Sequence, residues 1–206
     1  MIMRSNEYYI VQKQVVAFRR ENKLDSYTPI NLKKLISKLN ILTLFRPLSD
    51  NFSGMCLRDR YNNRFMLINS NQSIGRQNFT IGHEFYHLFI ENNPTPHKCN
   101  PGGRHKNKVE KNADMFSSIL LMPEEGIIQK LSEEELKNKG IDLATIVKLE
   151  QYFSVSRSAL LYRLLNLKLI TKDSCGDLLN LPVKKTAREY GYSVELYEPA
   201  NKGLFI

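Results

Sequence analysis

The chain has 206 residues, of which 42% are hydrophobic and 25% are charged, and its formal net charge is +9. This balance is typical of a globular protein with one domain, or one domain and a small appendage, and it excludes disordered and collagen-like chains. The positive charge is compatible with an acidic or nucleic-acid partner, but a solvated basic surface has the same composition.

The compartment is indicated by the cysteines and the apolar runs. Three cysteines, far apart and without a CxxC pair, argue against a disulfide scaffold and favour a reducing compartment. The first residues, "MIMRSNEYYIVQKQ", lack the apolar run and the small-residue cleavage site of a signal peptide. The longest apolar stretch, at 116–122, is too short to span a bilayer. We therefore expect a cytoplasmic protein that does not contact the membrane.

The first half of the chain contains both helical and β-type patterns. Apolar residues recur at helical spacing in three segments, which predict helices over 7–22, 30–40 and 75–91. Short β-prone runs predict three strands, over 41–45, 53–59 and 63–69. The last two strands are separated by "RYN" and should form an antiparallel pair around a turn.

The second half is mainly helical. Residues 92–107 contain three prolines and two glycines and predict a long loop, which in a compact domain is often functional. Beyond it, helices are predicted over 108–121, 123–130, 132–139, 142–152, 156–167, 171–180 and 183–190, and a strand over 193–198. The pattern indicates the α+β class, with a small antiparallel or mixed sheet in residues 1–125 and a mainly helical region in 126–206.

The stretch "HEFYH" carries the clearest chemical pattern. On a helix, His83 and His87 lie one turn apart on the same face, so both rings can bind one metal ion. Glu84 is rotated by about 100° from His83 and can reach a water molecule on that metal. This is the H-E-x-x-H pattern of zinc peptidases. Two histidines on a helix can also be a surface feature, but Glu84 and the amphipathic helix favour a zincin-like domain that binds Zn²⁺.

A zinc site needs a third protein ligand. The metzincin pattern places glycine and histidine where this chain has Ile90 and Asn93, which excludes that class. Glu110 and Asp114 lie four residues apart on the predicted following helix, so Glu110 can complete the site while Asp114 accepts a hydrogen bond from a ligand histidine. The small side chain of Ala113 would let the two helices approach closely.

Several roles have alternatives. The loop residues His97, Cys99 and His105 are rival third ligands, and Glu110 can instead be a solvated charge. The oxyanion donor is open between His97, His105 and a nearby tyrosine. The predicted strand "NRFMLIN" is expected at the edge of the sheet beside the cleft, where it would pair with an extended substrate segment.

The blocks "RQNFTIGHEFYHLFIE" and "VEKNADMFSSILLMP" together resemble the ImmA/IrrE family of HExxH metallopeptidases. That family pairs R-x-x-F-T-x-x-H-E-x-x-H with E-x-x-A-N-x-F-A-x-x-L-L-M-P, and the likeness extends more loosely over about residues 28–165. The resemblance implies that His83, His87 and Glu110 are the zinc ligands and that Glu84 is the catalytic base.

Two positions depart from the family pattern. Family members often have glycine where this chain has Tyr86, and usually asparagine where it has Asp114. Aspartate at the second position is what gluzincins use, so the site should keep working. The resemblance also implies a protein substrate, because several members relieve transcriptional repression by cleaving a helix-turn-helix repressor of a phage, mobile element or stress operon, and others belong to toxin–antitoxin-like pairs.

Residues 142–167 predict a helix-turn-helix-like pair, with Ser156 as the N-cap of the second helix. Four side chains of that helix are expected on the outside: Arg157, Ser158, Tyr162 and Arg163. A rival function is therefore a DNA-binding regulator, or a toxin–antitoxin component, that uses the zincin fold as a scaffold. A helix pair that packs on the peptidase core is the plainer interpretation, since the arginines are few for a phosphate-binding face.

Overall fold

The computed structural model describes residues 5–92, 107–138 and 140–199. The first half contains α1 (Asn6–Glu21), α2 (Leu32–Lys38), β1 (Ile41–Arg46), β2 (Gly54–Arg58), β3 (Arg64–Asn69) and α3 (Ile74–Phe89). The second half contains α4 (Lys108–Leu121), α5 (Glu124–Ile128), α6 (Glu133–Asn138), α7 (Leu143–Phe153), α8 (Arg157–Leu167), α9 (Lys172–Leu179), α10 (Val183–Glu189) and the 3-10 helix η1 (Glu195–Tyr197).

The predicted helices and the first three strands are confirmed, with small shifts at their ends. The largest shift is in α2, which is shorter than the predicted helix at 30–40. Asn40 has a left-handed φ of 52°, which ends the helix immediately before β1. None of the helices in the described part of the chain combines the length and the apolar character needed to cross a membrane.

In the described residues, three strands form one mixed sheet in the order β1-β3-β2. The predicted antiparallel pair of β2 and β3 is confirmed, while β1 runs parallel to β3, with Leu44 opposite Leu67. The expectation that "NRFMLIN" forms the edge strand is wrong, because β3 pairs on both sides and lies in the centre. Strand order depends on pairing between distant segments, which alternation within one strand does not encode.

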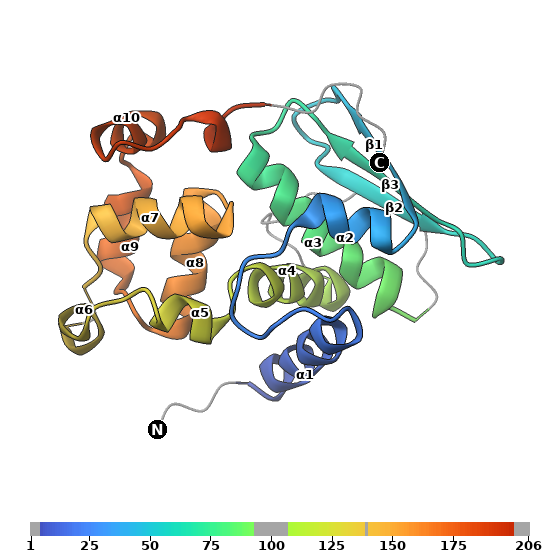
Figure 1. Ribbon diagram of the computed structural model, residues 1–206, viewed down its shortest axis with the longest axis horizontal. Coiled ribbons are helices and arrows are strands. Elements are labelled where there is room, and N and C mark those ends of the chain that lie inside the picture. Colours follow the sequence, from blue (N-terminus) through green and yellow to red (C-terminus); the bar gives the residue numbers. More distant parts are fainter. Residues whose placement is uncertain (1–4, 93–106, 139, 200–206) are drawn as a thin grey trace.

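Helix α3 lies between the sheet and α4, and α1 packs on α4 (Figure 1). Alternating residues of the strands point toward α3, and they include Phe45, Met66 and Ile68, all nearly inaccessible to solvent. On the other side of α3, the Phe85 ring lies 5.8 Å from the ring of Phe18 on α1. Burying each such side chain stabilises the fold by roughly 1.5–3 kcal/mol. This core holds α3 rigidly on both sides.

The predicted helix-turn-helix-like pair is present as α7 and α8, and its turn packs on the beginning of α3. The hydroxyl of Ser156 caps α8 by accepting from the backbone N–H of Ala159. The side chain of Asn78 donates to the carbonyl of Ser154 at 2.8 Å. Gly75 is needed at this contact, because a Cβ there would lie 2.6 Å from the backbone nitrogen of Ser156.

The segment after α10 returns to the beginning of α3. The backbone N–H of Ile74 donates to the carbonyl of Glu198 at 3.0 Å, and Ser73 and Pro199 form an isolated bridge. The prediction of a strand over 193–198 is wrong, because this segment forms η1. Apart from that bridge the described residues offer it no strand partner, and Tyr197 is instead held by side-chain hydrogen bonds.

The exposed placement predicted for the arginines of α8 is also wrong. Arg157 and Arg163 are only 3% and 2% exposed, whereas Tyr162 is 54% exposed. The guanidinium of Arg157 donates to the carboxylate of Glu150 on α7, and Nε of Arg163 donates to the carbonyl of Met122 at 3.0 Å. Both arginines turn inward because buried acceptors on α7 and directly after α4 need donors.

Candidate metal centre

Helices α3 and α4 approach each other closely at one point. A Cβ on Gly82 would lie 2.5 Å from Oγ of Ser117 on α4, so this position on α3 tolerates only glycine without displacement. The Ser117 hydroxyl donates to the carbonyl of Phe79 at 2.7 Å. Ala113, expected from its small size to permit the approach, is completely buried on α4. The crossing places the first turn of α4 over the last two turns of α3.

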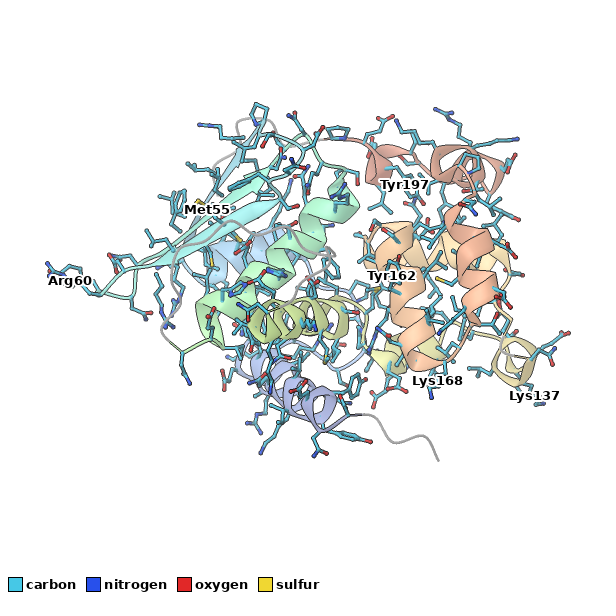
Figure 2. The ribbon with its side chains drawn as sticks, turned by 180° about the vertical axis from the view of Figure 1, so that it is seen from behind. Met55, Arg60, Lys137, Tyr162, Lys168 and Tyr197 are labelled. Atoms are coloured by element: carbon cyan, nitrogen blue, oxygen red, sulfur yellow. The ribbon has the colours of Figure 1, made fainter. Side chains whose placement is uncertain are left out.

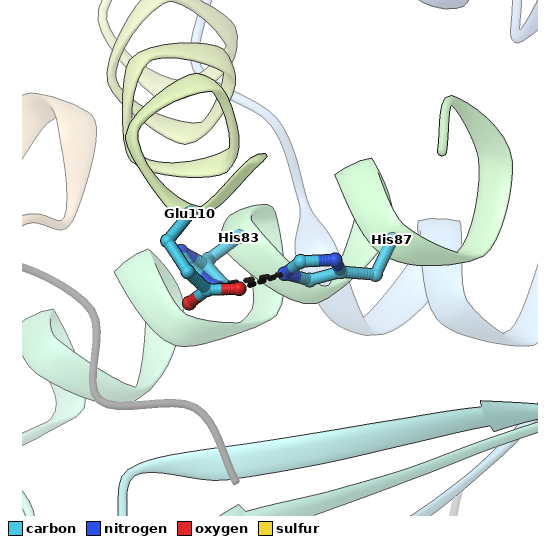
Figure 3. Close-up of side chains that lie close together, drawn as sticks. All are labelled: His83, His87 and Glu110. Carbon is cyan, nitrogen blue, oxygen red and sulfur yellow. Dashed lines mark hydrogen bonds and ion pairs between the residues drawn. The ribbon is translucent and has the colours of Figure 1, made fainter. Parts of the chain in front are cut away.

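Three side chains meet at this crossing (Figure 3). The Nε2 atoms of His83 and His87 lie 3.1 Å apart. One carboxylate oxygen of Glu110 lies 3.4 Å from Nε2 of His83, and the other lies 3.4 Å from Nε2 of His87. A tetrahedral zinc ion with bonds of about 2.0–2.1 Å separates its ligand atoms by about 3.3–3.4 Å. The residues present therefore fit such an ion.

A carboxylate lies behind each imidazole. Nδ1 of His83 is 2.8 Å from the Asp114 carboxylate on α4, and Nδ1 of His87 is 2.5 Å from the carboxylate of Glu91. A proton on Nδ1 that is donated to a carboxylate leaves the Nε2 lone pair available for a metal. Asp114 therefore lies where the sequence predicted it. Glu91 was missed, although its position four residues after His87 was a signal.

The ionisation of the two histidines differs. Burial lowers the pKa of His83, but hydrogen bonds with Asp114 and Glu110 outweigh this effect and raise the pKa to about 9. Burial is the largest effect at His87 and lowers its pKa, although the hydrogen bond with Glu91 opposes it. In the metal-free protein at neutral pH, His83 therefore carries a proton that a metal ion has to displace.

Glu84 is completely buried beside these residues, and neither of its carboxylate oxygens accepts a hydrogen bond from an N–H or O–H group of the described part of the chain. Its carboxylate lies against the edge strand β2, where a Cβ on Gly54 would be 3.1 Å from Oε1 of Glu84 and 2.6 Å from Cγ2 of Thr80. Burial, the adjacent charge of Glu84 and a hydrogen bond from the thiol to the Glu84 carboxylate raise the pKa of the Cys56 thiol. A buried carboxylate that has no N–H or O–H donor and lies beside three converging ligands suits a general base.

The structure thus brings together His83, His87 and Glu110, with Glu84 and Asp114 next to them. The rival third ligands lie outside the described residues, together with most of the predicted loop: His97, Cys99 and His105. The two histidine candidates for the oxyanion donor therefore lie there too, and the choice between them and a nearby tyrosine stays open. Sequence reasoning did not identify Gly54 as a contact of Glu84, because that contact depends on how β2 packs against α3.

The comparison with known families agrees with this arrangement. The family model for the IrrE N-terminal-like domain, peptidase family M78, matches residues 36–165. The match includes the sheet, the crossing of α3 and α4, and the α7–α8 pair. It also runs across the boundary predicted between 125 and 126, a division that stays a prediction. No curated protein sequence matches the chain significantly. Because the family model covers well over half of the chain, the protein belongs to the IrrE N-terminal-like family of M78 peptidases.

Proposed function

We propose that this protein is a zinc-dependent endopeptidase that cleaves a specific cytosolic partner protein. One observation carries the proposal: the Nε2 atoms of His83 and His87 and the carboxylate of Glu110 converge at 3.1 and 3.4 Å, the spacing of ligands around zinc. Membership of a peptidase family supports the same chemistry. His83, His87 and Glu110 would hold the ion.

Bound zinc supplies a Lewis acid that polarises the scissile carbonyl and makes a water molecule acidic. Glu84 then takes the proton of the attacking water on its carboxylate and passes it to the leaving amine. Its burial and its lack of N–H and O–H donors among the described residues keep its oxygens available for this transfer. Asp114 holds the His83 ring in the orientation that points Nε2 inward.

The substrate segment is proposed to pair with β2, the edge strand nearest to Glu84, in place of the central strand β3. An extended peptide adds to a free strand edge through main-chain hydrogen bonds, which allow many side chains. Met55 marks this strand in Figure 2, and Arg60 marks the hairpin tip at its far end. Because Gly54 has no side chain, β2 can pack directly against the Glu84 carboxylate.

A helix-turn-helix transcriptional repressor of a phage, mobile element or stress operon is the proposed partner. This assignment rests on the resemblance of the two motif blocks to the ImmA/IrrE family. The alternative role as a DNA-binding regulator is not supported by any specific observation. The two arginines of α8 that would face DNA are buried and engaged with Glu150 and Met122.

Metal content tests the proposal first. Native protein purified without added metal should hold close to one zinc per chain, and His83→Ala and Glu110→Gln should lose it. Glu84→Gln should keep the zinc. It should also capture its protein substrate uncut from a lysate of the source cells, and the native enzyme should cleave that same protein. Native protein that binds no zinc even after addition, or a Glu84→Gln variant that cleaves as fast as the native enzyme, would refute the proposal.

A further inference from the structure

The two ligand histidines of the candidate metal centre are each backed by a carboxylate, but these carboxylates have different origins. Asp114 comes from α4 and reaches His83 across the helix crossing. Glu91 comes from the same segment as His87, just beyond the end of α3, and its carboxylate lies 2.5 Å from Nδ1 of His87. The Glu91 side chain is 19% exposed, so the contact is largely shielded from water.

The turn that carries Glu91 is held from two directions. The backbone N–H groups of Ile90 and Glu91 both donate to the carbonyl of Tyr86, at 2.8 and 2.9 Å. From the β2–β3 hairpin, Nη1 of Arg58 donates to the carbonyl of Leu88 at 3.1 Å. These bonds satisfy carbonyl groups at the end of α3, and they fix the position from which the Glu91 carboxylate returns to His87.

The Glu91 carboxylate determines which nitrogen of His87 carries the proton, and this matters because the two histidines lie so close together. A neutral imidazole without a fixed partner can carry its proton on either nitrogen. At 3.1 Å, a proton on Nε2 of either ring would be donated to the other ring, and both ligand positions would be occupied. Once the extra proton of His83 has been displaced, carboxylates at both Nδ1 atoms hold the remaining protons on the outer side, so both Nε2 lone pairs point at the same place.

We infer that Glu91 is a second positioning residue of the metal centre, which holds His87 with its proton on Nδ1 and thereby strengthens zinc binding. The inference rests on the proposed zinc site and adds to it a residue that neither the H-E-x-x-H pattern nor the Glu110/Asp114 helix contains. Glu91 acts on the metal through His87 and does not contact the reacting atoms.

Zinc affinity measures this role directly, by competition with a chromophoric chelator. Glu91→Ala should weaken zinc binding by about 10- to 100-fold, the usual effect of removing an outer carboxylate. Glu91→Gln should lose less, because its amide oxygen still accepts from Nδ1–H but carries no charge. Glu134→Gln, which changes an exposed glutamate on α6, is the matched control and should bind zinc like the native protein.

A spectroscopic measurement separates this role from a merely structural one. In zinc-loaded protein with ¹⁵N-labelled histidines, the Nδ1–H groups of His83 and His87 should give two signals protected from exchange. Glu91→Ala should lose only the His87 signal, and Asp114→Ala only the His83 signal. If the native protein binds zinc and Glu91→Ala has the same zinc affinity and the same two Nδ1–H signals, this inference alone is overturned. Native protein that binds no zinc would overturn the proposed function and this inference together.

Discussion

Two glutamates in the described part of the chain are completely buried, and they differ in what surrounds them. Both carboxylate oxygens of Glu150 on α7 accept hydrogen bonds from Arg157, and Tyr197 donates to one of them at 2.5 Å. Both oxygens of Glu84 on α3 accept none from an N–H or O–H group of the described residues, and the donor there is the weaker Cys56 thiol. A buried charge with strong donors ties three segments together, whereas one without an N–H or O–H donor is costly and is kept where chemistry requires it. The difference separates a structural glutamate from a candidate catalytic one.

The largest expected effect is on catalysis. Glu84→Gln should lower the rate of substrate cleavage by about 10²- to 10⁴-fold, because the amide does not accept the proton of the attacking water. Its stability in urea should be equal to or higher than that of the native protein, since a buried charge is removed. Cleavage is measured as loss of the captured substrate on gels. If Glu84→Gln cleaved as fast as the native protein but was much less stable, Glu84 would have a structural role like that of Glu150.

For Arg157, the partner of Glu150, we expect a loss of stability with no change in the metal centre. Arg157→Ala leaves a buried carboxylate with fewer donors and should lower the free energy of unfolding by about 3–5 kcal/mol. Urea denaturation measures the loss, and zinc content per folded chain should not change. Lys185→Ala removes an exposed ion pair with Glu189 and should leave stability nearly unchanged. Arg157→Ala as stable as the native protein would contradict this interpretation of the cluster.

A smaller effect is expected where the edge strand meets Glu84. The added methyl of Gly54→Ala would contact Thr80 and Glu84, and should cost about 1–3 kcal/mol of stability as overpacking. It should also slow cleavage while zinc stays bound, because the carboxylate is displaced and the ligands are not. Gly176→Ala on α9 meets no atom within 4 Å and serves as the control. Equal cleavage by both variants would show that Gly54 has no role in placing Glu84.

The pH dependence should be the mildest effect. The pKa of His83 in the folded chain, about 9, is above the ordinary 6.5. Its proton therefore stabilises the metal-free fold fully below pH 6.5, and this contribution is lost as the pH rises through about 9. The pH dependence of zinc binding has the opposite sign. Zinc affinity should increase about tenfold per pH unit between pH 7 and 8, because binding displaces one proton. Chelator competition at both pH values measures this, and a flat affinity would contradict it.

The local parts of the fold and of the candidate site were predictable because they depend on neighbours along the chain. Helical spacing placed His83 and His87 on one face and Glu84 beside them, and the same spacing paired Glu110 with Asp114. Nearly all the helices and the first three strands also followed from apolar periodicity. These features involve interactions within one or two turns, where backbone geometry leaves few alternatives.

Other features were decided only by tertiary structure. The alternation in "NRFMLIN" predicted a strand but not its central position, because strand order is settled by pairing between β1, β2 and β3. The arginines of α8 looked exposed by periodicity, yet buried acceptors on α7 and after α4 draw them inward. Glu91 bonds His87 because the chain turns beyond α3, and the packing of the β2–β3 hairpin supports that turn. The sequence by itself determined His83, Glu84, His87, Glu110 and Asp114 as candidate site residues, because helical spacing is a local property. Only the packing of distant segments decided which charges are paired, since burial and hydrogen-bond partners arise from contacts far apart in the chain.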